Sequence, residues 1–203
     1  MTHYFTNEGG DKRTYERTLD FGEREFVFTT SDGVFSKKDV DAGTHWLLQA
    51  AVPLIHDRPV TVVDLGCGYG VLGVVIAALK PSVKCLMLDV NVRAVELANA
   101  NAKRNQVHGR ATAHFGDGIG DLARDVDYVI TNPPFRAGKQ VVLRFFEESY
   151  QALARGGSLF AVLRKQQGAG SYTKALADIF GDFCVLLRKK GYVVVEAVKT
   201  RGN

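Results

Sequence analysis

Three glycines at alternate positions separate two apolar runs in the first half of the chain. Gly66, Gly68 and Gly70 follow the β-branched run Val60–Leu65 and precede the apolar run Val71–Leu79. Glycine has no Cβ, so it accepts the positive φ angles of a sharp turn and allows close approach of a ligand. The pattern predicts a buried strand, a tight turn and a helix whose free N–H groups point toward whatever binds there.

The alternation of strand and helix continues to the end of the chain. Further strands are predicted at residues 83–88, 111–115, 126–131 and 158–163, helices at 91–105 and 141–153, a polar loop at 164–170, and a closing hairpin at 183–187 and 192–198. Repeated βα units favour a mostly parallel sheet with helices on both faces. The predicted fold class is therefore α/β, with a mostly parallel seven-stranded sheet that ends in an antiparallel hairpin.

The segment before the glycine turn is organised differently. Residues 1–16 are polar and are expected to form a flexible terminus. Alternating apolar residues on either side of Gly22 predict a small β-hairpin, and Thr44 is expected to cap a helix. A chain of 203 residues has the size of one domain. We expect a single domain, 1–203, made of the terminus 1–16, a hairpin and helix at 17–58, and the core at 59–199.

Composition argues against several classes of protein. The longest apolar run is far shorter than the ~20 residues of a membrane span, and the polar start has no signal-peptide core. Cys67, Cys85 and Cys184 are scattered and lack metal-ligand spacing. These features predict a cytoplasmic protein with reduced thiols, no metal and no membrane partner.

The net charge of +4 is unevenly distributed. Residues 132–203 contain 12 Lys or Arg and 5 Asp or Glu, whereas residues 1–131 contain 14 and 17. Such a division can mark a basic face for a polyanion, and an ordinary solvated surface is the alternative.

Aspartates end three successive predicted strands. Asp64 precedes the first glycine, where a carboxylate would repel a dinucleotide pyrophosphate but attract a sulfonium or ammonium group. Asp89 lies 19 residues after Gly70, in the position of an acid that binds ribose hydroxyls. Asp117 could accept a hydrogen bond from an adenine amino group. One such aspartate is most often a cap or turn residue, but three in succession favour a cofactor cleft.

The tetrapeptide Asn132-Pro133-Pro134-Phe135 follows the fourth strand. Two prolines are stiff and donate no backbone hydrogen bonds, so this segment presents a fixed set of acceptors. The Asn132 amide oxygen and a proline carbonyl would suit the two donors of a planar NH₂ group. Phe135 could stack on a base, or it could pack in the core of a rigid loop. Catalysis would then rest on in-line positioning of a neutral amine.

Four segments carry a resemblance to a known family. Residues 62–70 resemble the first motif of class I methyltransferases, and residues 132–135 resemble their amino-methylating motif. Upstream, residues 33–36 and 41–44 resemble the opening of the methyltransferase small-domain family, which includes ribosomal RNA guanine-N2 methyltransferases. The resemblance covers most of the chain. It implies a Rossmann-like fold with S-adenosylmethionine as the cofactor.

The resemblance also implies two sets of site residues. The cofactor set is Asp64, Gly66, Cys67, Gly68, Gly70, Asp89, Val90, Asp117, Gly118 and Asn132, with Phe35, Asp41 and Thr44 as a lid near the methionine end. The catalytic set is Asn132, Pro133, Pro134 and Phe135, and the predicted substrate set adds Arg136, Lys139 and Lys165 because they follow the fourth and fifth core strands. The basic residues among them, together with Arg164, are expected to contact phosphates or to be plain solvated charges.

Two departures leave the acceptor open. The best-known ribosomal members have two tandem domains and a His after the tetrapeptide, whereas this chain has one domain and Arg136. The leading hypothesis is methylation of guanine-N2 in ribosomal RNA, free or in a ribosomal particle. Adenine-N6 and protein glutamine are alternative acceptors, because each is a planar NH₂ group. A non-catalytic RNA-binding or assembly factor is a third hypothesis, and a nicotinamide-dependent reductase comes last.

Overall fold

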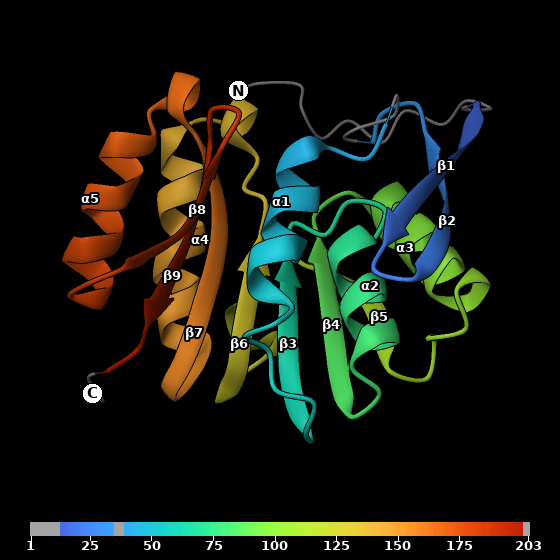
Figure 1. The fold of residues 1–203 in the computed structure, drawn as a ribbon, viewed down its shortest axis with the longest axis horizontal. Helices are drawn as coiled ribbons and strands as arrows, with labels where there is room; N and C mark the ends of the chain where they lie inside the picture. The colour runs from blue at the N-terminus through green and yellow to red at the C-terminus, as the bar shows by residue number, and fades with distance from the viewer. Residues whose placement is uncertain (1–12, 35–38, 201–203) are drawn as a thin grey trace.

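The computed structural model describes residues 13–34 and 39–200, which form one large sheet flanked by helices and one small hairpin (Figure 1). The strands of the large sheet are β3 (Val60–Leu65), β4 (Val83–Asp89), β5 (Ala111–Phe115), β6 (Val126–Thr131), β7 (Leu153–Arg164), β8 (Cys184–Lys189) and β9 (Tyr192–Val198). The helices are α1 (Ala42–Ala51), α2 (Val71–Leu79), α3 (Val92–Arg104), α4 (Lys139–Ala152) and α5 (Ala169–Phe180). The hairpin consists of β1 (Thr14–Phe21) and β2 (Arg24–Ser31).

The large sheet has the strand order β5-β4-β3-β6-β7-β9-β8. Strands β3 to β7 are parallel, and β9 is antiparallel to both β7 and β8. The strand order reverses between β3 and β6, and ligands of open α/β sheets bind beyond the carboxyl ends of the strands at such a point. We call that end of the sheet, where β3, β4, β6 and β7 finish, the carboxyl edge. The predicted mostly parallel seven-stranded α/β fold is confirmed.

Two apolar cores lie on opposite faces of the sheet. Successive strand residues point to opposite faces, so Val62 packs with α1, α2 and α3, whereas its neighbour Val63 packs with α4 and α5. Both side chains are 0% exposed. None of the helices in the described ranges has the length and apolar content of a membrane span.

Four predictions about local structure were wrong. Strand β1 begins at Thr14, inside the segment expected to be flexible, because Thr14 pairs with Ser31. Helix α1 is capped by Asp41 instead of Thr44; the carboxylate accepts from the N–H groups of Gly43 (2.8 Å) and Thr44 (3.3 Å).

The other two errors lie in the C-terminal half. Residues 164–170 are not one loop: they contain the 3₁₀ turn η3 (Lys165–Gln167) and the start of α5, a helix that was not predicted. Glycines at positions 168 and 170 lower helix propensity there and hid the helix start. Strand β7 begins at Leu153, five residues earlier than expected, with an irregular register against β6.

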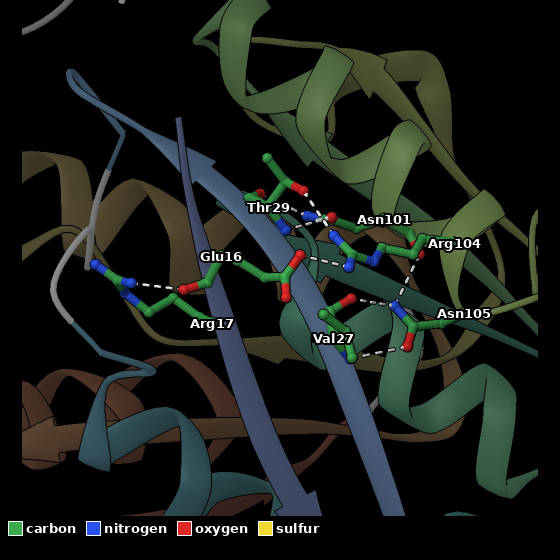
Figure 2. A network of polar contacts seen from close by, with 7 residues as sticks. All are labelled: Glu16, Arg17, Val27, Thr29, Asn101, Arg104 and Asn105. Atoms are coloured by element: carbon green, nitrogen blue, oxygen red, sulfur yellow. Dashed lines mark hydrogen bonds and ion pairs between the residues drawn. The ribbon is translucent and has the colours of Figure 1, made fainter. Parts of the chain in front are cut away.

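Two asparagines on α3 hold the hairpin in place (Figure 2). The Asn101 amide accepts from the Thr29 N–H (2.7 Å) and donates to the Thr29 carbonyl (2.9 Å). Asn105 does the same with Val27, at 3.2 and 2.9 Å. Four residues along a helix rise ~6 Å, and two residues along a strand span ~6.6 Å. Side-chain amides four residues apart on α3 therefore match backbone groups two residues apart on β2. The helix therefore replaces a neighbouring strand along the edge of β2.

The same amide links the hairpin to the glycine turn. Asn101 is 0% exposed, and its nitrogen also donates to the carbonyl of Tyr69 (2.8 Å), between two of the glycines. Arg104 adds a hydrogen bond to the Thr29 hydroxyl and an ion pair with Glu16 of β1 (Figure 2). The hairpin is thus joined to the candidate site through α3.

Candidate active site

The glycine turn is attached to the end of β4. The N–H groups of Gly66 and Cys67 both donate to the carbonyl of Leu88, at 2.8 and 2.9 Å. Gly66, Gly68 and Gly70 have φ angles of 74°, 55° and 90°, in the left-handed region that glycine adopts most easily.

Two of these glycines serve different purposes. A Cβ on Gly70 would lie 3.0 Å from the Cβ of Ala98, so glycine allows α3 to pack against the turn. Apart from its chain neighbours, no atom of the described residues lies within 4 Å of the place of a Cβ on Gly68. Gly68 therefore borders open space, which leaves room for a ligand against the backbone.

Asp64 is a buried carboxylate with one unused oxygen. The side chain is 0% exposed, and one oxygen accepts from the Gly73 N–H at 3.0 Å. The other oxygen has no partner within the part of the chain that the structure describes. Burial, assisted by the negative charge of Asp89, raises the pKa of Asp64 to about 7. A buried oxygen without a partner is costly, so a cationic ligand group beside it would be bound favourably.

Asp89 is oriented by backbone donors. One oxygen accepts from the Gly68 N–H (2.8 Å) and the other from the Asn91 N–H (2.8 Å). Burial nevertheless raises the pKa of this carboxyl above its ordinary value, against the effect of these hydrogen bonds. Each oxygen keeps a further lone pair, so a fixed Asp89 could still accept from two hydroxyl groups.

Asp117 has different surroundings from the other two aspartates. Its side chain is 65% exposed and pairs through both oxygens with Arg144 of α4. The hydrogen bond from Arg144 lowers the pKa of this carboxyl. The neighbouring Gly118 is buried with φ of 102°, and a Cβ there would collide with Glu148. A role of Asp117 in adenine recognition stays a prediction.

The Asn132 amide is held in one orientation. Its nitrogen donates to a carboxylate oxygen of Asp41 and to the hydroxyl of Thr44, both at 3.0 Å. An ionised carboxylate can only accept, so the nitrogen must face Asp41. The amide oxygen is thereby turned to the other side and can accept a hydrogen bond from a substrate. Sequence reasoning expected Asn132 to act as an acceptor, but not that Asp41 and Thr44 would orient it.

Arg164 and Tyr192 fix Asp41 in turn. The Arg164 guanidinium donates to the second oxygen of Asp41 (3.2 Å), hydrogen-bonds the Tyr192 hydroxyl and lies 4.7 Å above the Tyr192 ring. The two residues are register partners in β7 and β9. Tyr192 was missed by sequence reasoning, because no local signal connects it to position 41. Arg164 was expected to contact phosphates or to be a solvated charge. Its guanidinium contacts Asp41, and a phosphate contact stays a prediction.

The proline segment forms consecutive tight turns. The Pro133 carbonyl accepts from the Phe135 N–H (2.9 Å), and the Pro134 carbonyl accepts from the Ala137 N–H (2.8 Å). Each carbonyl keeps one lone pair for a substrate. The Phe135 ring lies 5.5 Å from that of Tyr172 on α5, at an interplanar angle of 53°. Phe135 is half-buried, so one side packs against the protein, while stacking of a base on it stays a prediction.

The remaining predicted site residues are dispersed along the carboxyl edge. Arg136, Lys139 and Lys165 are exposed and follow β6 and β7. Cys67 is buried, and burial raises the pKa of its thiol, which favours a packed neutral side chain over a redox role. Val90 is half-buried after Asp89. The predicted lid residue Phe35 falls outside the described residues, and the lid role of Asp41 and Thr44 stays a prediction.

Comparison with known proteins assigns this arrangement to a family. Residues 25–196 match the methyltransferase small domain family. The chain belongs to that family. This methyltransferase small domain is 36% identical to the uncharacterized protein YbxB of Bacillus subtilis (strain 168), a match that covers 98% of this chain and 100% of that protein. It is 30% identical to the ribosomal RNA small subunit methyltransferase C of Vibrio cholerae serotype O1, over 89% of this chain and 52% of that protein.

A solved structure agrees with this assignment. The 16S rRNA guanine-N2 methyltransferase RsmC of T. thermophilus, in complex with AdoMet and guanosine, is 27% identical and superposes with a TM-score of 0.81. The match covers 92% of this chain and 50% of that one, so this chain spans about half the length of the ribosomal RNA methyltransferases it matches. The predictions of family, Rossmann-like fold, methyltransferase class and S-adenosylmethionine as the family's cofactor are confirmed.

Proposed function

We propose that this methyltransferase small domain transfers a methyl group from S-adenosylmethionine to an exocyclic amino nitrogen of an RNA base, guanine-N2 of ribosomal RNA in the leading case. The observation that carries the proposal is the fixed amide of Asn132. Its nitrogen is committed to Asp41 and Thr44, so its oxygen is the part left to face a donor. A planar NH₂ group is such a donor, and it is shared by the three acceptors predicted from the sequence.

The residues around the glycine turn fit the cofactor. Asp64 has an oxygen that lacks a partner within the described residues, which suits the cationic methionine end, and Gly68 borders open space. Asp89 is held ready to accept from the ribose hydroxyls by the N–H groups of Gly68 and Asn91. When bound there, S-adenosylmethionine supplies an electrophilic methyl group on a sulfonium.

The chain's own residues would orient the acceptor. Hydrogen bonds from the amine to the Asn132 oxygen and to a carbonyl of Pro133 or Pro134 turn its lone pair toward the methyl group. With the amine so held, the bound cofactor would supply its methyl group to the nitrogen and leave as the neutral thioether, and the methylated amine would release a proton to water. No strong base is needed, so the rate gain rests on positioning, a contribution that can approach ~7–11 kcal/mol.

RNA is favoured as the acceptor by charge and by the relatives. The 12 Lys or Arg and 5 Asp or Glu of residues 132–203 give the acceptor half of the chain a positive balance that attracts phosphates. The V. cholerae and T. thermophilus relatives are named as ribosomal RNA methyltransferases. An acceptor in ribosomal RNA would place the enzyme in the cytoplasm.

The test is transfer of a radiolabelled methyl group from S-adenosylmethionine to naked ribosomal RNA, ribosomal subunits and total protein in parallel. Asn132→Ala serves as the blank, and labelled RNA is digested to nucleosides. Label in N2-methylguanosine supports the proposal in full, and label in N6-methyladenosine moves the acceptor to adenine. Label in protein alone contradicts the RNA proposal, and no label despite cofactor binding favours the assembly-factor hypothesis.

A further inference from the structure

The turn between β8 and β9 lies at the carboxyl edge, near the candidate site. Strand β9 runs antiparallel to β7, so its first residue, Tyr192, pairs with Arg164 at the end of β7. The N–H of Lys165 donates to the carbonyl of Gly191 in the turn (2.9 Å). Figure 1 shows the turn at the same end of the sheet as the arrowheads of β3 and β6.

The end of β8 and this turn carry three consecutive cations, Arg188, Lys189 and Lys190, which we call the basic arm. All three are exposed, and no Asp or Glu occurs in residues 183–195. The Lys189 ammonium lies 4.1 Å from the centre of the Trp46 ring. Trp46 is on α1, two residues after Thr44, which holds the Asn132 amide. The arm is therefore fixed beside the elements that orient the acceptor.

The acids of the C-terminal half are placed elsewhere. Residues 128–146 and 149–177 contain no Asp or Glu, and these ranges include the loops after β6 and β7. Glu147 and Glu148 lie on α4, where Glu148 accepts from the Ile119 N–H. Asp178 lies near the C-terminal end of α5, Asp182 follows that helix, and Glu196 is four residues along β9 from Tyr192. The cations at the carboxyl edge, among them Arg136, Lys139 and Lys165, thus outnumber the acids that residues 128–200 place there. The N-terminal segments add Asp41, which is paired with Arg164, and Asp20 and Asp39, which line the same hollow as Trp46.

We propose that the basic arm binds the phosphate backbone of the RNA substrate and holds it across the site of Asn132. This rests on the proposed RNA acceptor and adds a contact surface to it. Lys189 and Lys190 supply the phosphate contacts, and Lys165, tied to the turn through Gly191, extends them toward the proline segment. Phosphate contacts of this kind position a nucleic acid without reading its sequence.

The test compares two double variants, each of which loses two positive charges. Lys189→Gln with Lys190→Asn removes the arm's charge, and Asn tolerates the positive φ of 48° at position 190. Lys84→Gln with Arg155→Gln is the control, because both residues are exposed and lie near the opposite ends of β4 and β7. Binding of a fluorescein-labelled RNA hairpin is measured by anisotropy over a salt series with cofactor present, and methyl transfer to the proposed ribosomal RNA is measured in parallel.

The arm variant is expected to bind the RNA about tenfold more weakly, with a salt slope lower by roughly 1.4–1.8 for two lost phosphate contacts. KM for RNA should rise while kcat at saturating RNA is unchanged, and the control should match the wild type. The proposal that the basic arm binds phosphate is overturned if both variants lose RNA affinity equally, or if the arm variant binds RNA like the wild type. A wild-type protein without salt-sensitive RNA binding refutes the RNA acceptor itself, and the arm with it.

Discussion

The carboxyl edge of the sheet has two halves that carry opposite charge. Beyond β3 and β4, the charged groups are Asp64 and Asp89, which are buried or half-buried and hold raised pKa values. Beyond β6, β7 and the β8–β9 turn, most charged groups are exposed cations such as Lys165 and Lys190, and the one carboxylate that contacts Asn132, Asp41, is paired with Arg164. One half is suited to bind a single small cation closely, and the other to attract a large polyanion from solution.

The two halves also differ in how their side chains are fixed. Asp64 and Asp89 are oriented by backbone N–H groups of the glycine turn and the segments that follow it. Asn132, on the border, is instead held by side chains from distant segments, Asp41 of the α1 cap and Thr44. The orientation of the side chains in the cofactor half is therefore set mainly by backbone groups of the strand ends, whereas in the acceptor half it depends on side chains from distant segments. The comparison implies that substitutions in the acceptor half should lower kcat, whereas substitutions in the cofactor half should raise the Kd for the cofactor.

The largest effect is expected from Asn132→Ala. Loss of an acceptor that acts on the reacting amine should lower kcat by roughly 10²–10³-fold, as for other hydrogen-bonding groups at reaction centres. Cofactor affinity, measured by calorimetry, should remain within about twofold, because the buried aspartates are untouched. Retained turnover would contradict the amine-acceptor role.

Asp89→Ala should have the complementary effect on the cofactor half. A charged hydrogen-bond acceptor contributes about 1.5–3 kcal/mol, so cofactor Kd should rise roughly 10- to 100-fold. Asp89→Asn keeps one acceptor for the Gly68 N–H and should be milder. Asp121→Ala is the matched control, since that side chain is 89% exposed and pairs with Arg124. Unchanged affinity in Asp89→Ala would remove Asp89 from the cofactor site.

The sequence predicted the cofactor half better than the acceptor half. Strands β3 and β5 have the predicted bounds, and β4 is one residue longer than predicted, because each is a short apolar or alternating run. Strands β6 and β9 of the acceptor half also have the predicted bounds. The strand-end aspartates follow directly from those bounds. In the acceptor half, α5 was hidden by glycines at its start, and the link from Tyr192 through Arg164 to Asp41 joins residues more than a hundred positions apart. The antiparallel pairing of β7 with β9 brings Tyr192 beside Arg164, and a local sequence pattern does not predict such a pairing.

A smaller and graded effect is expected from pH on the cofactor half. The pKa of Asp64 is raised from 3.8 to about 7, so the folded chain holds a proton that the unfolded chain releases near pH 4. Stability without cofactor should therefore fall as pH rises between about 4 and 7. A cationic ligand group favours the ionised form, so cofactor Kd should decrease as pH rises, by up to about tenfold per unit below pH 7.

Calorimetry and thermal melts at about pH 5, 6, 7 and 8 would test this for Asp64. Asp64→Asn keeps an acceptor for the Gly73 N–H but does not titrate, so it should flatten most of both dependences. The pKa of Asp89 is raised in the same direction, so a residual slope with the same sign is expected. A wild-type affinity that does not change across this range would show that Asp64 faces no cationic group.

The smallest effect is expected from Arg164→Met, which tests the long-range support of the acceptor half. The variant removes the hydrogen bond and ion pair to Asp41 but keeps an apolar stem over Tyr192. Because Arg164 is 42% exposed, the pair is worth about 1 kcal/mol or less, and kcat should fall by no more than about fivefold. Cofactor affinity and RNA KM should not change, since Arg164 positions Asn132 through Asp41 and contacts neither ligand. Arg155→Met, on the same strand at the opposite edge, is the matched control and should behave like the wild type. A rise in RNA KM at constant kcat would instead show that Arg164 contacts a phosphate. It would then belong with the cations that attract RNA and not with the residues that position Asn132.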